Sequence, residues 1–116
     1  MNIEAIRDYC LSKKETSESF PFNETALVFK VAGKMYALLN LEVPHSINLK
    51  CDPETAIRLR ENYSYVLPGY HMSKKHWNTI LLDDFVPDDL IREWIDTSYR
   101  LVVQGLPALK RSQIGA

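Results

Sequence analysis

A long stripe of apolar and small side chains near the end of the sequence constrains the fold most strongly. The stripe predicts a helix that starts at Pro87-Asp88-Asp89 and lies on a sheet. Gly105, Leu106 and Pro107 match the left-handed residue, hydrophobic contact and helix breaker of a Schellman-type C-cap. The residues of the stripe recur every three or four positions: Leu90, Ile91, Trp94, Ile95, Ser98, Leu101 and Val102.

Two β-rich runs between Thr25 and Leu41 predict the first part of that sheet. The segments TALVFKV and MYALLNL flank the glycine-containing turn AGK, which is typical of an antiparallel hairpin. A third strand is expected over 46–50, because apolar and polar residues alternate there. Ile47 and Leu49 would lie on one side, and Ser46, Asn48 and Lys50 on a side that meets solvent or a partner.

The register of this hairpin stays open at this point. A two-residue Ala32-Gly33 loop would pair Phe29 with Tyr36. A three-residue loop would instead pair Phe29 with Ala37, and the side chains of one strand would then change faces.

Local signals predict the remaining elements. Trp77 is expected to be structural and to pack against the final helix near Trp94 or Ser98. The other expectations are a helix over about 3–13, a loop over 15–24 with Phe20 and Phe22 on the core, a helix from Asp52-Pro53-Glu54 to about Asn62, a short strand before Pro68-Gly69, a strand over 77–82, and a frayed end from Lys110.

These elements sum to one α+β domain over 1–116, with 107–116 as a poorly ordered tail. We expect a two-layer α-β sandwich, in which helices pack on one face of an antiparallel sheet. The 116 residues are 46% hydrophobic and 25% charged, which favours a globular chain over a disordered one. No apolar run of membrane-spanning length occurs, and Cys10 and Cys51 have no CxxC spacing, so a cytoplasmic protein with reduced thiols is expected.

Sequence motifs of catalysis are missing. No nucleophile elbow surrounds a serine, and four glycines cannot form a phosphate-binding loop or a dinucleotide fingerprint. His71 and His76 lack a third ligand at an informative spacing. We therefore expect a protein that is not an enzyme and has no cofactor or metal.

A set of cations beside the predicted hairpin tips is the main candidate site. The formal net charge is −1, so nucleic-acid binding would need a local positive patch. Lysines beside turns also serve solubility and protect strand edges, and that interpretation stays open. The candidate nucleic-acid-binding residues are Lys30, Lys34, Lys50, Lys74, Lys75 and His76.

The sequence resembles the MmcQ/YjbR family over nearly its whole length. The similarity is carried by FKVAGKMYALLNL, LKCDPETAIRLREN, PGYHMSKKHWNTILLD and WIDTSYRLVVQGLPALKR. The resemblance implies a CyaY-like fold and a DNA-binding protein with a "double wing" of two hairpins. Lys30 and Lys34 would then lie near the first wing, and Lys74, Lys75 and His76 at the second.

Two functional hypotheses follow. The first is a non-enzymatic DNA-binding protein whose lysines contact the phosphate backbone weakly and in a salt-sensitive manner. The alternative is an adaptor for a protein or a small ligand that uses the open sheet face around Tyr36, Asn48 and Lys50.

Overall fold

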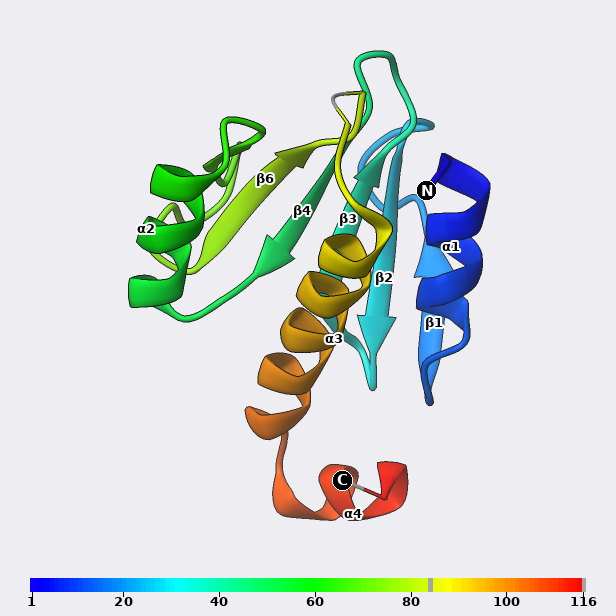
Figure 1. Ribbon diagram of the computed structural model, residues 1–116. Helices are drawn as coiled ribbons and strands as arrows, with labels where there is room; N and C mark the ends of the chain where they lie inside the picture. Colours follow the sequence, from blue (N-terminus) through cyan, green and yellow to red (C-terminus); the bar gives the residue numbers. More distant parts are fainter. Residues whose placement is uncertain (84, 116) are drawn as a thin grey trace.

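A computed structural model describes residues 1–83 and 85–115. Groups of consecutive strands are separated by helices along the chain, which makes this an α+β protein (Figure 1). The elements are α1 (Ile3–Leu11), β1 (Thr16–Ser19), β2 (Ala26–Val31), β3 (Lys34–Asn40), β4 (Ser46–Lys50), α2 (Pro53–Asn62), β5 (Val66–Pro68), β6 (Trp77–Leu81), α3 (Asp88–Gln104) and α4 (Ala108–Ile114).

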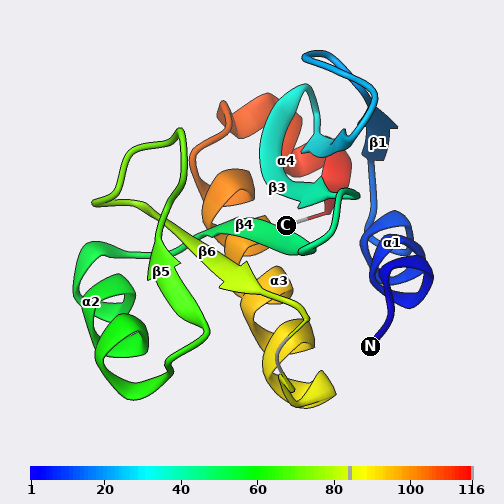
Figure 2. The same ribbon diagram turned by 90° about the horizontal axis from the view of Figure 1, so that it is seen from above.

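The strands form one antiparallel sheet in the order β1-β2-β3-β4-β6-β5. Helices α1, α2 and α3 cover one face of this sheet and leave the other face open (Figures 1 and 2). The predicted antiparallel sheet with helices on one face is therefore confirmed. The core lies between the layers, where Phe29, Tyr36, Leu39, Ile47 and Ile95 are fully buried.

Helix α3 holds the predicted apolar stripe against the sheet. Its buried side chains include Ile91, Trp94, Ile95 and Ser98. The predicted Schellman-type cap is wrong, because Gly105 has a φ of −83° and continues the right-handed conformation. At the start of α2, the Asp52 carboxylate accepts the predicted capping hydrogen bond from the Thr55 N–H over 3.1 Å.

The first hairpin combines the short loop of one predicted register with the strand pairing of the other. Ala32 and Gly33 form a two-residue turn with φ values of 49° and 83°, and they join the paired residues Val31 and Lys34. A β-bulge then follows, so that Phe29 faces Ala37. Tyr36 is the extra residue in β3, and it is buried among the helices.

Two segments that were expected to be irregular form regular secondary structure. Strand β1 occupies part of the predicted loop and pairs with β2, although its sequence TSES has no apolar alternation. The predicted frayed end is also wrong over 108–114, where the chain forms α4. Ile114 at the end of α4 is buried, and the Arg111 guanidinium donates to the Gln104 carbonyl.

None of the described helices combines the length and the apolar character that a membrane crossing requires.

Candidate functional site on the open face of the sheet

The side of the sheet opposite α1, α2 and α3 is called the open face below. Antiparallel register arranges its side chains in rows across the strands. One row crosses β3, β4 and β6 and consists of Leu38, Asn48 and Thr79. The next row crosses β4 and β6 and consists of Lys50 and Trp77. The residues that face this side from the four central strands are Ala26, Val28, Lys30, Met35, Leu38, Asn40, Ser46, Asn48, Lys50, Trp77, Thr79 and Leu81.

The topology brings the tips of both hairpins to the same end of the sheet. Strands β2 and β4 end there, and β3 and β6 begin there (Figure 1). Lys34 lies at the β2–β3 turn, and Lys30 pairs with Met35 just before it. Lys50 lies at the end of β4 opposite Trp77, which follows directly on the segment that carries Lys74, Lys75 and His76.

These cations are available to a ligand. Lys34, Lys74, Lys75 and His76 are exposed, and Lys30 and Lys50 are partly exposed. Within residues 1–83 and 85–115, the ion pairs involve other groups: the Met1 amino group, Arg7, Lys13 and Arg92. The same end of the sheet also carries exposed carboxylates: Glu15, whose backbone carbonyl accepts from the Ala32 N–H beside the turn, and Asp52, which follows Lys50 by two residues.

A groove of about 930 Å³ crosses the open face beside these cations. Its floor consists of sheet residues, including Leu67 and Pro68 of the edge strand β5, and its walls come from three connecting segments: 22–25, 42–44 and 70–72. Figure 2 shows the segments near residue 20 and near residue 70 rising from the sheet away from the helices. Phe22 and Tyr70, which line the groove, are 70% and 68% exposed.

Hydrogen bonds from the floor hold one wall in place. The Thr79 hydroxyl donates to the Asn48 Oδ1 over 2.7 Å and accepts from the Tyr70 N–H over 2.9 Å. The Asn48 Nδ2 donates to the Tyr70 carbonyl over 3.2 Å. The 69–72 backbone is therefore attached to both β4 and β6, so the groove is formed in the protein without a ligand.

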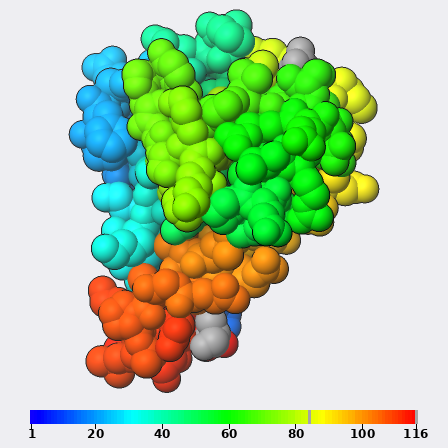
Figure 3. Space-filling view, turned by 90° about the vertical axis from the view of Figure 1, so that its left-hand side faces the viewer, coloured from blue at the N-terminus to red at the C-terminus, as the bar shows by residue number. Residues whose placement is uncertain are grey.

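The space-filling view displays the segments that carry the second group of cations. In Figure 3 the yellow-green segment around residues 70–76 and the cyan tip of the first hairpin are both exposed on the same side of the molecule. Helix α2 borders that segment, and the Arg60 guanidinium donates to the Lys74 carbonyl over 2.9 Å.

The predicted placements of Trp77, Phe20 and Phe22 are wrong. Trp77 alternates with Asn78, so it lies on the open face, and the ring partners of Trp94 are Tyr63 and Tyr65. The expected core residues Phe20 and Phe22 are 48% and 70% exposed, respectively.

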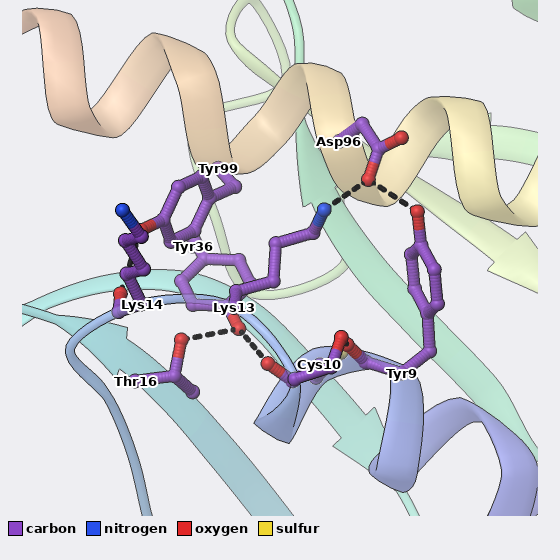
Figure 4. A network of polar contacts seen from close by, with 9 residues as sticks. Tyr9, Cys10, Lys13, Lys14, Thr16, Tyr36, Asp96 and Tyr99 are labelled. Carbon is purple, nitrogen blue, oxygen red and sulfur yellow. Dashed lines mark hydrogen bonds and ion pairs between the residues drawn. The ribbon is translucent and has the colours of Figure 1, made fainter. Parts of the chain in front are cut away.

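Tyr36 was expected on the open face and instead points toward the helices (Figure 4). Its hydroxyl donates to the Cys10 carbonyl over 3.0 Å and lies 3.0 Å from the Thr16 hydroxyl. The Tyr99 ring packs edge-on against the Tyr36 ring, with 5.2 Å between the two ring centroids. Tyr36 therefore fastens α1 and β1 to the sheet and is not part of the open face.

The sulfur and metal chemistry of the described residues is limited. Burial raises the pKa of the Cys10 thiol to about 12 and that of the Cys51 thiol to about 11, so both are protonated near neutral pH. No cluster of three or more His, Cys, Asp or Glu side chains suited to a metal ion occurs in residues 1–83 and 85–115.

The sequence reasoning missed the groove and found the cations beside it. Phe22, Leu38, Tyr70 and Met72 line the groove from three separate parts of the chain, and none of them carries a local motif. The available signal was the polar side of the predicted third strand, because an alternating strand with Asn48 facing outward implies an uncovered face.

Known proteins are similar to this chain in both sequence and fold. A family model described as YjbR matches residues 11–101. The uncharacterized protein YjbR of Escherichia coli K12 is 35% identical over 112 residues, which is 96% of this chain and 95% of that protein. The uncharacterized protein YyaQ of Bacillus subtilis is 34% identical over 113 residues, covering 84% of this chain and 95% of YyaQ.

Solved structures agree with these sequence matches. The crystal structure of Deinococcus radiodurans DR2400, with a DUF419 domain, superposes with a TM-score of 0.91 at 37% identity, covering 98% of this chain and 88% of that one. A crystal structure from Pseudomonas syringae gives a TM-score of 0.77 at 31% identity, covering 87% of this chain and 98% of the other. The resemblance noted from the sequence is therefore confirmed, and the chain belongs to the YjbR family.

Proposed function

We propose that this protein binds nucleic acid through the cations at the hairpin-tip end of the open face. One observation carries the proposal: four strands begin or end there, and they bring Lys30, Lys34 and Lys50 to the end of the sheet where the 74–76 segment also lies. Ammonium groups on separate elements can contact successive phosphates of a nucleic-acid backbone.

The distribution of charge supports this orientation. The opposite end of the sheet carries acidic groups, including Asp83, whose carboxylate accepts from the His45 N–H over 2.7 Å. Asp88 and Asp89 lie in the first turn of α3, and Asp88 pairs with the Met1 amino group. A polyanion would therefore meet the lysine end and be repelled from the acidic end, although the net charge is −1.

The chemistry favours weak contacts with phosphates. Lysine presents a point charge, whereas base-specific readout relies mainly on Arg, Asn and Gln. For about four phosphate contacts, affinity should fall about 100-fold between roughly 50 and 200 mM salt. The family resemblance, with its label of DNA binding, points to the same ligand class.

Fluorescence anisotropy of labelled DNA tests the proposal. A Lys30→Ala, Lys34→Ala, Lys74→Ala, Lys75→Ala variant should lose binding and flatten the salt dependence. A matched control removes four exposed cations from helices: Arg58→Ala, Arg92→Ala, Arg100→Ala, Lys110→Ala. Because both variants lose four positive charges, a net-charge effect would be equal in the two proteins.

Two results would contradict the proposal. Folded wild-type protein that binds no DNA at about 50 mM salt would leave the adaptor hypothesis for the open face as the better one. An equal loss of affinity in the lysine variant and the control would exclude a localised site.

A further inference from the structure

We propose that the open face binds single-stranded nucleic acid, with unpaired bases in the groove and phosphates on the neighbouring lysines. This inference rests on the proposed function and goes beyond it by naming the strand form and the place of the bases. It draws on one juxtaposition: a largely uncharged groove with exposed aromatic walls lies directly beside a row of cations.

The spacing between the two features suits a nucleotide. Asn48 in the floor and Lys50 lie two residues apart on the same face of β4, so their Cα atoms are about 7 Å apart. Met35 lines the groove and pairs with Lys30 on the neighbouring strand. Lys30 and Lys50 thus border the groove, and a base inside it would leave its phosphate near them.

The lining of the groove favours an uncharged flat group. Among the described residues that line it, Glu42 is the only carboxylate and there is no lysine or arginine, and apolar groups such as Leu38, Met35 and Met72 supply much of its surface. Methionine side chains adapt to differently shaped ligands. The described lining offers the phosphates no lysine or arginine, so they would remain at the lysine border of the groove.

Aromatic rings at the walls provide surfaces on which bases can stack. Tyr70 and Phe22 are 68% and 70% exposed, although both belong to the groove. Trp77 lies in the lysine row directly opposite Lys50 and is partly exposed. Aromatic faces beside a cationic track are the usual means by which proteins hold single strands without sequence preference.

Uncharged polar groups at the floor can meet base edges. Asn40 and Ser46 face each other across β3 and β4 and line the groove. The Asn40 Oδ1 accepts from the Glu42 N–H over 3.1 Å, which leaves its Nδ2 as a donor directed by a fixed side chain. Paired bases inside a duplex cannot enter the groove, so a duplex would contact only the lysine border.

The test uses three probes of equal length: single-stranded oligothymidylate of about 12 nucleotides, the same backbone without bases, and a duplex. The groove variant is Phe22→Ala, Tyr70→Ala. Its matched control is Phe20→Ala, Phe85→Ala, which removes two exposed rings, 48% and 90% exposed, that do not line the groove. Because all four rings are exposed, both variants should fold.

We expect wild-type protein to bind oligothymidylate about tenfold or more tightly than the abasic strand or the duplex. The groove variant should lose most of that advantage and keep its affinity for the abasic strand, whereas the control should behave like wild type. Oligothymidylate should also quench the fluorescence of Trp77, which is more exposed than the buried Trp94.

The outcomes separate this inference from the proposed function. Equal affinity for all three probes, or unchanged oligothymidylate binding in the groove variant, would overturn the base-binding groove and leave the lysine site intact. No binding of any probe at low salt would overturn both.

Discussion

The hydroxyl of Ser98 donates a hydrogen bond to the backbone carbonyl of Tyr36 over 2.5 Å, deep in the core. The same oxygen accepts from the Lys50 N–H over 2.8 Å. The ladder between β3 and β4 stops at the pair Ala37 and Leu49, just before these two backbone groups. Ser98 on α3 therefore completes the hydrogen bonding of the sheet next to the bulge.

Replacement of this serine should be costly. Ser98→Ala would leave the Tyr36 carbonyl and the Lys50 N–H without a partner, and we expect a loss of about 2–4 kcal/mol in the free energy of unfolding. Urea denaturation measures this loss, with Ser112→Ala on the exposed side of α4 as the control. A change below about 0.5 kcal/mol would mean that the two backbone groups find other partners.

Removal of the Tyr36 hydroxyl should weaken the attachment of α1 and β1. Tyr36→Phe keeps the ring against Tyr99 and deletes the contacts with the Cys10 carbonyl and the Thr16 hydroxyl. We expect a loss of about 1–2 kcal/mol, together with faster amide exchange in α1. Tyr65→Phe is the control, and similar losses in both variants would contradict a specific role of the Tyr36 hydroxyl.

Local sequence signals predicted the elements whose stability depends on their own residues. The α3 stripe and the Asp52 cap are of this kind, because periodicity and capping act within one segment. The alternation of β4 likewise assigned Ile47 and Asn48 to opposite faces. These features also located the lysines beside the hairpin tips.

The parts that depend on distant contacts were not predicted. The bulge at Tyr36 is linked to hydrogen bonds with α1 and β1, which the hairpin sequence does not contain. Strand β1 is polar and gains its order from pairing with β2. The walls of the groove come from three connecting segments that are far apart in the sequence, so no single stretch of sequence indicates the groove.

Replacement of Gly33 and of Gly69 by alanine should destabilise the fold for different reasons, backbone conformation at Gly33 and steric overlap at Gly69. A Cβ on Gly33 would meet nothing within 4 Å, but its φ is +83°, so Gly33→Ala should cost about 1 kcal/mol through backbone strain alone. A Cβ on Gly69 would lie 2.8 Å from both the Cβ and the carbonyl oxygen of Trp77. Gly69→Ala should therefore cost more, about 2 kcal/mol or above, in thermal or urea unfolding. The reverse order of the two losses would contradict the close approach of β5 and β6.

Alkaline pH should destabilise the fold through its two buried thiols. Burial raises the pKa of Cys10 from 9.0 to about 12 and that of Cys51 from 9.0 to about 11. Above about pH 9 the unfolded chain loses these protons while the folded chain keeps them, so the free energy of unfolding falls as the pH rises. Each thiol contributes a slope of at most about 1.4 kcal/mol per pH unit.

Urea denaturation at about pH 8 and about pH 10 measures this decline. A Cys10→Ala, Cys51→Ala variant supplies the comparison, because other groups also titrate in this range and the difference between the proteins isolates the thiols. The variant should be less stable at the lower pH, since it loses buried sulfur atoms, but its stability should fall less toward the higher pH. Parallel declines in both proteins would mean that the thiols ionise equally well in the folded chain and are therefore not shielded by the core.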